Sequence, residues 1–391
     1  MSEYQYIEFR AIDGPVSDKN LEYMQKQSSR AEITAWSFTN EYHYSDFRGN
    51  VLEMLRRGYD MHLHYANFGI RTLMVRLPSG LPNEQAAAPY LDSENLTLHR
   101  DKTGRGCILE ISPSYEPGTL EDLWDLDVWL PRMLDIRSEL IEGDLRPLFI
   151  ARLGADYDSY HDPAETKEAP LPAGMGKLSA AQLTLAKFYG LDRATLAAAA
   201  QGAPPLPANS GLKVSPQQWL QGQSPARKDA WLAGLLSEDH AAVRPELVQA
   251  YRDDQPATAW PVVETGRTLE QLGAAAAETR QDMKAKAAAK REQERQQRLA
   301  KMAKDPDATL KQVDELVSTF STSGYEEASK LLAELLEARP ADGAKLAEAK
   351  AQMLRKKYPT KYRLVAALRA QDLLEPAPKL LAKAAKGKQA R

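Results

Sequence analysis

Hydrophobic and polar residues follow short-period patterns over the first 150 residues of the chain. Strands are expected over residues 4–10, 32–39, 60–68, 70–77 and 107–111, where alternating or apolar, β-prone runs occur. A turn is expected at Asn67–Gly69, between two of these strands. Helical spacing is found in residues 16–24, where Ser17 is the expected N-cap, and near residues 50–57.

Residues 120–141 also have helical spacing, with Trp124 and Trp129 available for burial and Pro131 as the expected break. Strands that alternate with helices in this way predict an α+β domain over residues 1–153. A ferredoxin-like sandwich is one topology of that class.

The pattern changes at residues 154–176, where Asp, Glu, Ser, Gly and Pro dominate and no apolar period is found. This segment is expected to form a linker. An all-α domain is predicted over residues 177–260, because helical runs broken by Gly and Pro follow one another there. These runs cover residues 178–188, 193–201, 216–221, 226–236 and 244–252.

Residues 267–304 contain no proline and a single glycine, Gly273. They predict one long basic helix of about 57 Å, at 1.5 Å per residue. Beyond it, apolar residues at helical spacing predict a helical bundle over residues 305–375, with Val313, Val317 and Phe320 on one of its apolar faces. A basic tail, residues 376–391, ends the sequence.

The composition is that of a globular protein: 43% of the 391 residues are hydrophobic and 27% are charged. A single cysteine, Cys107, excludes an internal disulfide and fits a reducing compartment. The first residues lack the pattern of a signal peptide, and no window is apolar enough to span a bilayer. The sequence therefore predicts a cytoplasmic protein that does not enter a membrane.

Charge is distributed unevenly along the chain. Residues 1–150 contain 15 Lys and Arg against 24 Asp and Glu, whereas the last 41 residues contain 11 against 2. Such asymmetry indicates electrostatic partners, although one end of the chain can also be the partner of the other.

The strongest candidate for a metal site is the sequence Asp60-Met-His62-Leu-His64. Alternate residues of a strand share a face, so one carboxylate and two imidazoles would lie together and could hold zinc or iron. His43 or Asp46 could supply a further ligand. The simpler interpretation is a strand with one solvent-exposed face, and the sequence favours it over a metal site.

Enzymatic chemistry has little other support in the sequence. His43 and Asp46 could form an acid–base pair, but no activated nucleophile accompanies them. Neither the Gly-x-x-x-x-Gly-Lys-Ser/Thr nor the Gly-x-Gly-x-x-Gly phosphate-binding pattern occurs. We therefore expect no cofactor and no catalytic activity.

One segment, residues 182–196, has the spacing of a helix-turn-helix unit. Ala186 is the small contact residue, Gly190 the turn glycine and Leu196 the apolar anchor. The second helix, however, offers few groups that could bind base edges: Arg193, Thr195 and Gln201. An ordinary helical hairpin is the favoured interpretation.

The long helix has the clearest binding signal, because residues 280–304 contain nine basic residues against three acidic ones. At 100° per residue, five basic residues form a narrow stripe: Arg280, Lys284, Arg291, Arg295 and Arg298. Four more precede the basic tail: Lys356, Lys357, Lys361 and Arg363. This surface has three interpretations: a solvated structural helix, a site for an acidic protein surface, and a site for nucleic acid.

Four stretches of the sequence resemble a group of bacterial hypothetical proteins. They are residues 4–13 (YQYIEFRAID), 29–34 (SRAEIT), 37–49 (SFTNEY and DFRG) and 66–78 (ANFGIRTLMVRLP). The resemblance extends more loosely to 137–148 and 231–236 and covers about residues 1–255. It implies a bacterial origin and no particular activity.

Taken together, these features predict a non-enzymatic adaptor or scaffold that binds an acidic partner through the long helix and the tail. The first alternative is a nucleic-acid-binding factor without sequence preference. The second is a metal-dependent enzyme that uses Asp60, His62 and His64.

Overall fold

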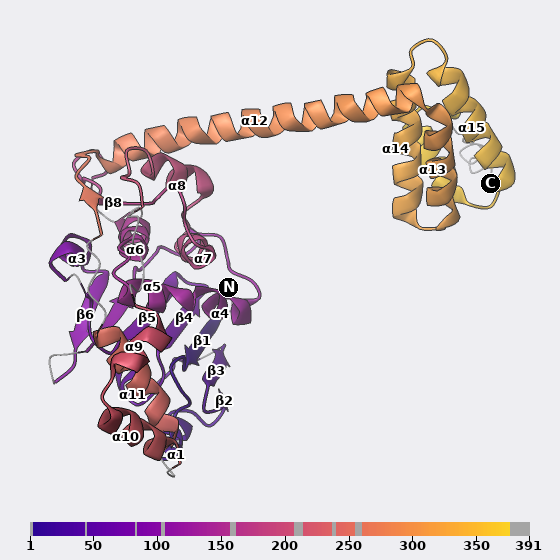
Figure 1. The fold of residues 1–391 in the computed structure, drawn as a ribbon. Helices are drawn as coiled ribbons and strands as arrows, with labels where there is room; N and C mark the ends of the chain where they lie inside the picture. Colours follow the sequence, from indigo (N-terminus) through magenta and orange to yellow (C-terminus); the bar gives the residue numbers. More distant parts are fainter. Residues whose placement is uncertain are drawn as a thin grey trace, which may run out of the picture. The chain divides into compact units, whose positions relative to one another are not determined.

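The computed structural model describes residues 3–43, 45–82, 84–102, 106–156, 162–206, 214–236, 240–254 and 260–375. The chain divides into two compact units, Met1–Asp282 and Met283–Arg391. The first contains a β-sheet with helices and the second contains helices (Figure 1). The predicted class, an α+β domain followed by helical regions, is confirmed. None of the described helices combines the length and the apolar composition that a membrane crossing requires.

The first unit contains a sheet of seven strands in the order β2-β3-β1-β4-β5-β7-β6. The strands are β1 (Gln5–Arg10), β2 (Glu32–Ile33), β3 (Ser37–Tyr42), β4 (Met61–Ala66), β5 (Ile70–Leu77), β6 (Leu96–Arg100) and β7 (Cys107–Ile111). Every pairing in this sheet is antiparallel. The first four strands have the ferredoxin-like topology that was considered, because the helices Asp18–Gln25 and Val51–Arg56 lie between β1 and β2 and between β3 and β4, and the strand order is β4-β1-β3-β2.

The expected turn between β4 and β5 is confirmed. Residues 67–69 connect the two strands as a hairpin, in which Met61 lies opposite Val75 and Ala66 opposite Ile70. Gly69 has φ +108°, and a Cβ there would lie 1.9 Å from the carbonyl oxygen of Tyr115. Only glycine fits this position.

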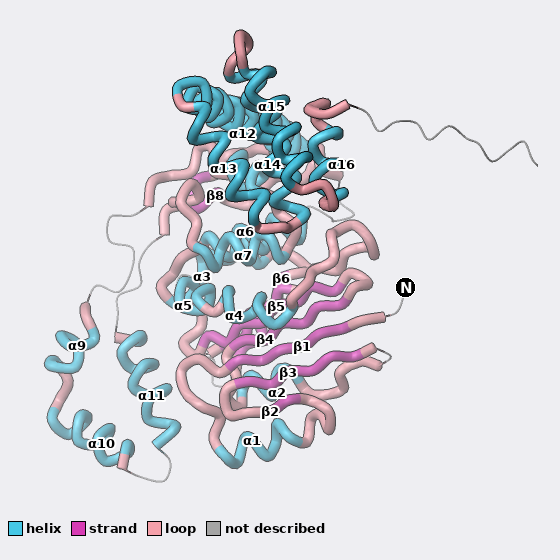
Figure 2. The backbone as a smooth tube through the Cα atoms, turned by 90° about the vertical axis from the view of Figure 1, so that its right-hand side faces the viewer, coloured by secondary structure: helices cyan, strands magenta, loops and turns pink. Residues whose placement is uncertain are grey.

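Both faces of the sheet are covered by helices (Figure 2). On one face, α1 (Asp18–Gln25) and α2 (Val51–Arg56) enclose a core that includes Phe9, Phe38 and Met54. The other face carries a larger core, which includes Leu63, Val75 and Leu109. Its helices are α3 (Glu84–Leu91), α4 (Trp129–Met133), α5 (Asp135–Ile141), α6 (Arg146–Asp156) and α7 (Ala180–Phe188).

Residues 120–125 are not helical, and the helix expected over 120–141 is broken, although not at the predicted position. A 3₁₀ turn over Leu126–Val128 precedes α4, and the break between α4 and α5 lies at Leu134 rather than Pro131. Pro131 lies in the first turn of α4, where a missing N–H costs nothing. Trp129 is buried as expected, but Trp124 is 78% exposed.

The segment 154–176 is not a free linker. Gly154–Asp156 complete α6, and Leu171, Ala173 and Met175 are buried in the larger core. Short strands β8 (Leu171–Pro172) and β9 (Val262–Val263) pair there, and buried Glu168 forms an ion pair of 2.8 Å with Arg267. Leu171, Ala173 and Met175 alternate with Pro172 and Gly174, which is the pattern of a short buried strand.

Four helices occupy the middle of the chain: α8 (Arg193–Ala199), α9 (Pro216–Gly222), α10 (Pro225–Leu235) and α11 (His240–Asp253). The last three pack around a small separate core of Trp219, Trp231, Val243 and Tyr251. Ser215 and Ser224 cap α9 and α10 by accepting backbone hydrogen bonds, each before a proline. These local signals explain why the sequence located the helices closely.

Helix α12 (Leu269–Lys304) spans 36 residues, close to the predicted 267–304. Leu272 and Ala276 are buried in the core of the first unit, and Leu299 and Met302 are buried in that of the second. All residues from 281 to 294 are exposed. Alanine and long polar side chains have high helix propensity, so this segment needs no apolar contact to remain helical.

The second unit is a bundle of the end of α12 with α13 (Pro306–Ser318), α14 (Thr322–Ala338), α15 (Gly343–Lys357) and α16 (Tyr362–Ala370). Its core includes Val313, Leu332, Leu354 and Leu368. The predicted basic tail, residues 376–391, lies outside the described residues.

Candidate functional site

Asp60, His62 and His64 have internal partners that occupy their ligating atoms. The Asp60 carboxylate accepts hydrogen bonds from the backbone N–H groups of Ile12 and Asp13, at 2.7 and 3.1 Å. It also forms ion pairs with Arg76 and Arg137, both at 3.1 Å. A carboxylate that already has two guanidinium partners is a poor metal ligand.

The two histidines lie on a packed face of β4. The His62 Nδ1 atom is 3.0 Å from the carbonyl oxygen of Glu8, and its ring stacks on Phe9 at 4.1 Å. Burial, reinforced by neighbouring His64, lowers the pKa of His62 to about 3, and burial also lowers the pKa of His64. The prediction that this face of the strand is exposed to solvent is therefore wrong. Among the described residues, no three metal-ligating side chains gather at one point.

The second histidine candidate, His43 with Asp46, is also arranged differently from the acid–base pair considered above. Asp46 accepts a 2.7 Å hydrogen bond from the Gln5 amide, and the Gln5 carbonyl lies 2.9 Å from Nε2 of His64. The ring of His43 lies 5.3 Å from that of Tyr4. The Asp46 carboxylate is thus connected to β1 and β4.

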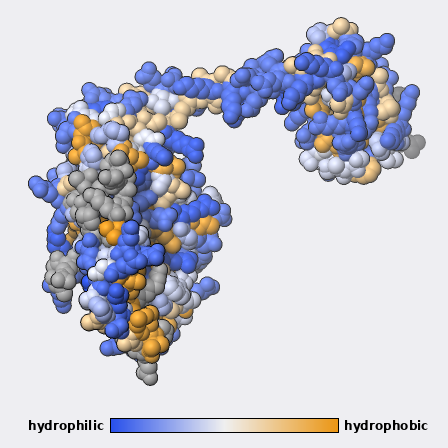
Figure 3. All heavy atoms as spheres, viewed as in Figure 1, coloured by the Kyte–Doolittle hydropathy of each residue, from blue (hydrophilic) through white to orange (hydrophobic). Residues whose placement is uncertain are grey.

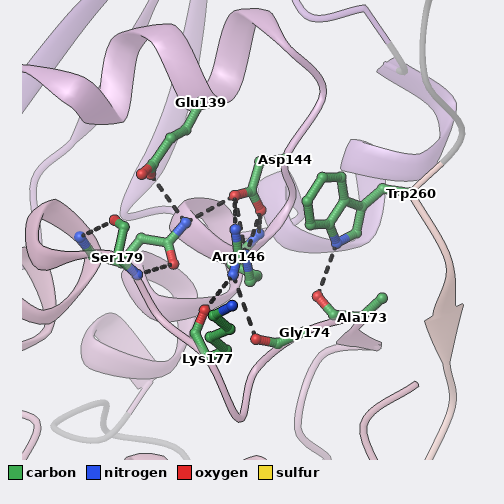
Figure 4. Close-up of polar contacts among 9 residues, drawn as sticks. Glu139, Asp144, Arg146, Ala173, Gly174, Lys177, Ser179 and Trp260 are labelled. Atoms are coloured by element: carbon green, nitrogen blue, oxygen red, sulfur yellow. Dashed lines mark hydrogen bonds and ion pairs between the residues drawn. The ribbon is translucent and has the colours of Figure 1, made fainter. Parts of the chain in front are cut away.

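A buried polar cluster that the sequence did not indicate lies between α5, α6 and α7 (Figure 4). Its centre is the ion pair of Arg146 with Asp144, at 2.6 Å. The Gln182 amide donates to Asp144 at 2.8 Å and to Glu139 at 3.0 Å. Burial raises the pKa of the Glu139 carboxyl.

The remaining donors of the Arg146 guanidinium bind the segment that follows α6. They donate to the carbonyl oxygens of Lys177 and Gly174, at 2.7 and 3.4 Å, and the ring of Trp260 lies 5.2 Å away. Trp260 in turn donates to the carbonyl of Ala173. Because these groups satisfy one another, the cluster anchors residues 173–177 rather than opening toward a ligand.

The helix-turn-helix candidate is a packed helical hairpin. Gly190 has φ +77°, as the sequence suggested for a turn glycine. The second helix, α8, is buried at Ala194, Thr195 and Leu196, and Asp192 caps it. Because most of α8 lies inside the first unit, it cannot enter a DNA groove without unpacking.

The predicted basic stripe on α12 falls into two groups. Three of its arginines have carboxylate partners: Arg280 pairs with Asp192 at 2.7 Å, Arg298 with Glu334 at 2.5 Å, and Arg295 with Glu292 and Glu337. Within the described part of the chain, Lys284 and Arg291 have no ion-pair partner, and both are exposed. Both of these unpaired members of the stripe lie in the exposed segment 281–294.

The four basic residues of the C-terminal helices lie close together at one end of the bundle. Lys356 and Lys357 end α15, Lys361 lies at the N-cap position of α16, and Arg363 lies in the first turn of α16. Arg363 donates to the Thr322 hydroxyl at 2.7 Å, at the start of α14. The turn between α13 and α14 therefore joins the same surface.

Aromatic side chains lie among these cations. Sequence reasoning missed these aromatic residues. The Lys361 ammonium is 4.6 Å from the centre of the Phe320 ring, and Phe320 packs edge-on against Tyr358 at 5.9 Å. Phe320 was expected on an apolar helix face but is 54% exposed, and Tyr362 is 81% exposed. The sequence signal was the alternation of basic and aromatic residues in KKYPTKYR (356–363).

The two units have opposite net charge. Residues 283–391 contain 24 Lys and Arg against 14 Asp and Glu, whereas residues 1–282 contain 27 against 40. In the view of Figure 3, hydrophilic residues cover most of the second unit. This unit is the part of the chain that is best suited to attract an anionic partner.

No family model matches the chain, and neither a curated protein nor a solved structure does.

Proposed function

We propose that this chain is a non-enzymatic adaptor or scaffold whose basic second unit holds an acidic partner. The observation that supports the proposal best is the excess of ten positive charges over residues 283–391, next to an excess of thirteen negative charges in the rest of the chain. Charge of this kind raises the rate and the selectivity of encounter with anionic surfaces.

The exposed segment of α12 supplies the first contact surface. Lys284, Lys286 and Arg291 lie there on a helix whose side chains are exposed all around. The arginines that do have partners, such as Arg298 with Glu334, form surface ion pairs. Such pairs are worth only about 0–1 kcal/mol, so carboxylates or phosphates of a partner can replace them.

One observation supports the nucleic-acid alternative: the aromatic residues Phe320, Tyr358 and Tyr362 lie among the C-terminal cations. The metal-enzyme alternative gains none, because Asp60 is bound by Arg76 and Arg137. As part of the proposal, the protein works in a bacterial cytoplasm, as its single cysteine and its resemblance to bacterial sequences suggest.

The test is the binding of the full chain to a fluorescent poly-glutamate, as a simple acidic polypeptide, over a series of salt concentrations. We expect binding that weakens steeply with salt, and a several-fold loss of affinity for the double variant Lys284→Glu/Arg291→Glu. A matched control, Lys19→Glu/Lys26→Glu, makes the same charge change on exposed residues of α1 and its C-cap. Absence of binding at low salt, or an equal loss in the control, would overturn the proposal.

A further inference from the structure

The end of the bundle where two turns meet carries a distinct surface, here called the aromatic–basic patch. It consists of Phe320, Lys357, Tyr358, Lys361, Tyr362 and Arg363. The first turn connects α13 to α14, and the second connects α15 to α16. Three contacts join the two turns: Phe320 with Tyr358, Phe320 with Lys361, and Thr322 with Arg363.

Cations and rings alternate within the patch at contact distance. The Lys361 ammonium lies 4.6 Å from the centre of the Phe320 ring, and the Lys357 ammonium lies 5.3 Å from that of Tyr358. Cation–π contacts of this length hold the lysines beside the rings without neutralising their charge. A ligand that presents both flat rings and negative charges would meet both groups at once.

Acidic side chains are absent from both turns. Residues 318–325 and 355–363 contain no Asp or Glu, but they contain hydroxyl groups at Ser321, Thr322 and Thr360. The nearest carboxylates along α13 and α14 are those of Asp314, which is bound to Lys350 at 2.6 Å, and of Glu315 and Glu326. The patch therefore keeps its positive charge, unlike the arginines near the end of α12.

Phe320 occupies a position that its type does not favour. Its φ is +53°, in the left-handed region that suits glycine or asparagine, and more than half of its surface is exposed. Neither backbone preference nor burial explains a phenylalanine there. A residue held in such a conformation is more consistent with a role in contact than with a role in the core.

The chemistry of the patch fits single-stranded nucleic acid best. Exposed rings stack on unpaired bases, whereas the bases of a duplex are already stacked, and lysine, arginine and hydroxyl groups bind phosphates. An acidic peptide would use the cations but would leave the rings unused. A membrane surface would require a larger exposed aliphatic area.

We propose that the aromatic–basic patch binds single-stranded nucleic acid, with bases on Phe320 and Tyr362 and phosphates at Lys357, Lys361 and Arg363. This inference rests on the proposed function, because it names the acidic partner of the second unit. It also predicts a preference for unpaired strands, which positive charge alone does not give.

The test compares three fluorescent probes on the full chain at fixed low salt: an oligouridylate of about 12 nucleotides, a blunt duplex of the same length, and poly-glutamate. Tyr362→Ala removes a side chain that is almost fully exposed, and Phe320→Gly places glycine where φ is positive. Neither change disturbs the buried core. Trp124→Ala is the matched control, since it removes an equally exposed ring from the first unit.

We expect the single strand to bind more tightly than the duplex. Each patch variant should weaken single-strand binding by about tenfold, the usual effect of losing one stacked base, and leave poly-glutamate binding unchanged. Cross-linking of a bromouridine oligonucleotide should map to peptides that contain Phe320 or Tyr362.

Two negative outcomes are distinguishable. If all three probes bind and the two patch variants behave like the Trp124→Ala control, the patch inference is overturned and binding by charge alone remains. If no probe binds the full chain at low salt, the proposed function fails together with the inference.

Discussion

Arg137 is a buried charged residue of the first unit that is held by several neighbours. It is fully buried, and its guanidinium binds Asp13 at 2.6 Å and Asp60 at 3.1 Å. Its Nε donates to the carbonyl of Arg76. The side chain thus ties the start of the chain and the start of β4 to helix α5.

Replacing Arg137 by methionine should destabilise the protein by about 3–5 kcal/mol, because buried Asp13 loses its cation. Urea unfolding followed by circular dichroism measures this change. Arg132→Met, an exposed arginine in α4, should shift the unfolding free energy by less than about 0.5 kcal/mol. A small effect at Arg137 would mean that the buried pair contributes little.

His62 should make stability depend on pH. Its pKa in the folded state is lowered to about 3, whereas a histidine in the unfolded chain has a pKa near 6.5. At a pH between these two values, the unfolded chain therefore binds a proton at His62 and the folded chain does not. The stability that neutral His62 gives the folded state is fully present above pH 6.5. As pH falls below this value, the free energy of unfolding decreases by about 1.4 kcal/mol per pH unit.

The variant His62→Gln cannot take up this proton. Its unfolding free energy should therefore fall less steeply than that of the natural chain between pH 6.5 and pH 4, as measured by urea unfolding at several pH values. The comparison removes the effect of carboxylates, which are common to both proteins. Equal slopes for the two proteins would show that His62 is not held neutral in the folded state.

At the scale of elements, local signals in the sequence correctly located those helices that do not depend on tertiary contacts. Helix α12 was located within two residues at its start and correctly at its end, because an alanine-rich, proline-free segment is helical on its own. Capped helices such as α9 and α10 were located for a similar reason.

Elements without such signals were missed or misplaced. Helix α6, which is buried at ten of its eleven residues, was not predicted. Helix α3 contains Pro89, and β6 is a five-residue edge strand. Strand β8 within the predicted linker was missed because it is only two residues long and forms by pairing with β9, which lies far along the chain.

The exposed part of α12 should open locally without affecting either core. Ala288→Gly should raise the rate of tryptic cleavage between residues 284 and 295 about fivefold, because glycine costs a helix about 1 kcal/mol. The unfolding midpoints of the protein should not move, since Ala288 is exposed. A lower midpoint would instead show that this segment supports one of the cores.

At the scale of the whole molecule, the sequence established the charge of the two units and the class of the fold. Among the predicted cations, Lys284 and Arg291 are exposed and Lys361 is partly buried, and their role in binding stays a prediction. The sequence could not show which arginines have partners, because Glu334 and Glu337 approach α12 only through the packing of α14.

Aromatic residues were the main omission at this scale. Helical spacing assigned Phe320 to the core of the bundle, but α13 ends at Ser318, before Phe320 is reached. Because the helix ends two residues before Phe320, this side chain faces outward instead of joining the core. The following turn places it beside Tyr358 and Lys361. Periodicity alone cannot detect this, because it assumes that the helix continues.

The position of Cys107 has a practical consequence. The side chain lies in β7 with 3% of its surface exposed, and burial raises the pKa of its thiol to about 11. A thiol that is neither accessible nor ionised reacts slowly with maleimides and iodoacetamides. A cysteine introduced at an exposed site would therefore be the one thiol that reacts readily, so a spin label or fluorophore could be attached there without first removing the natural one.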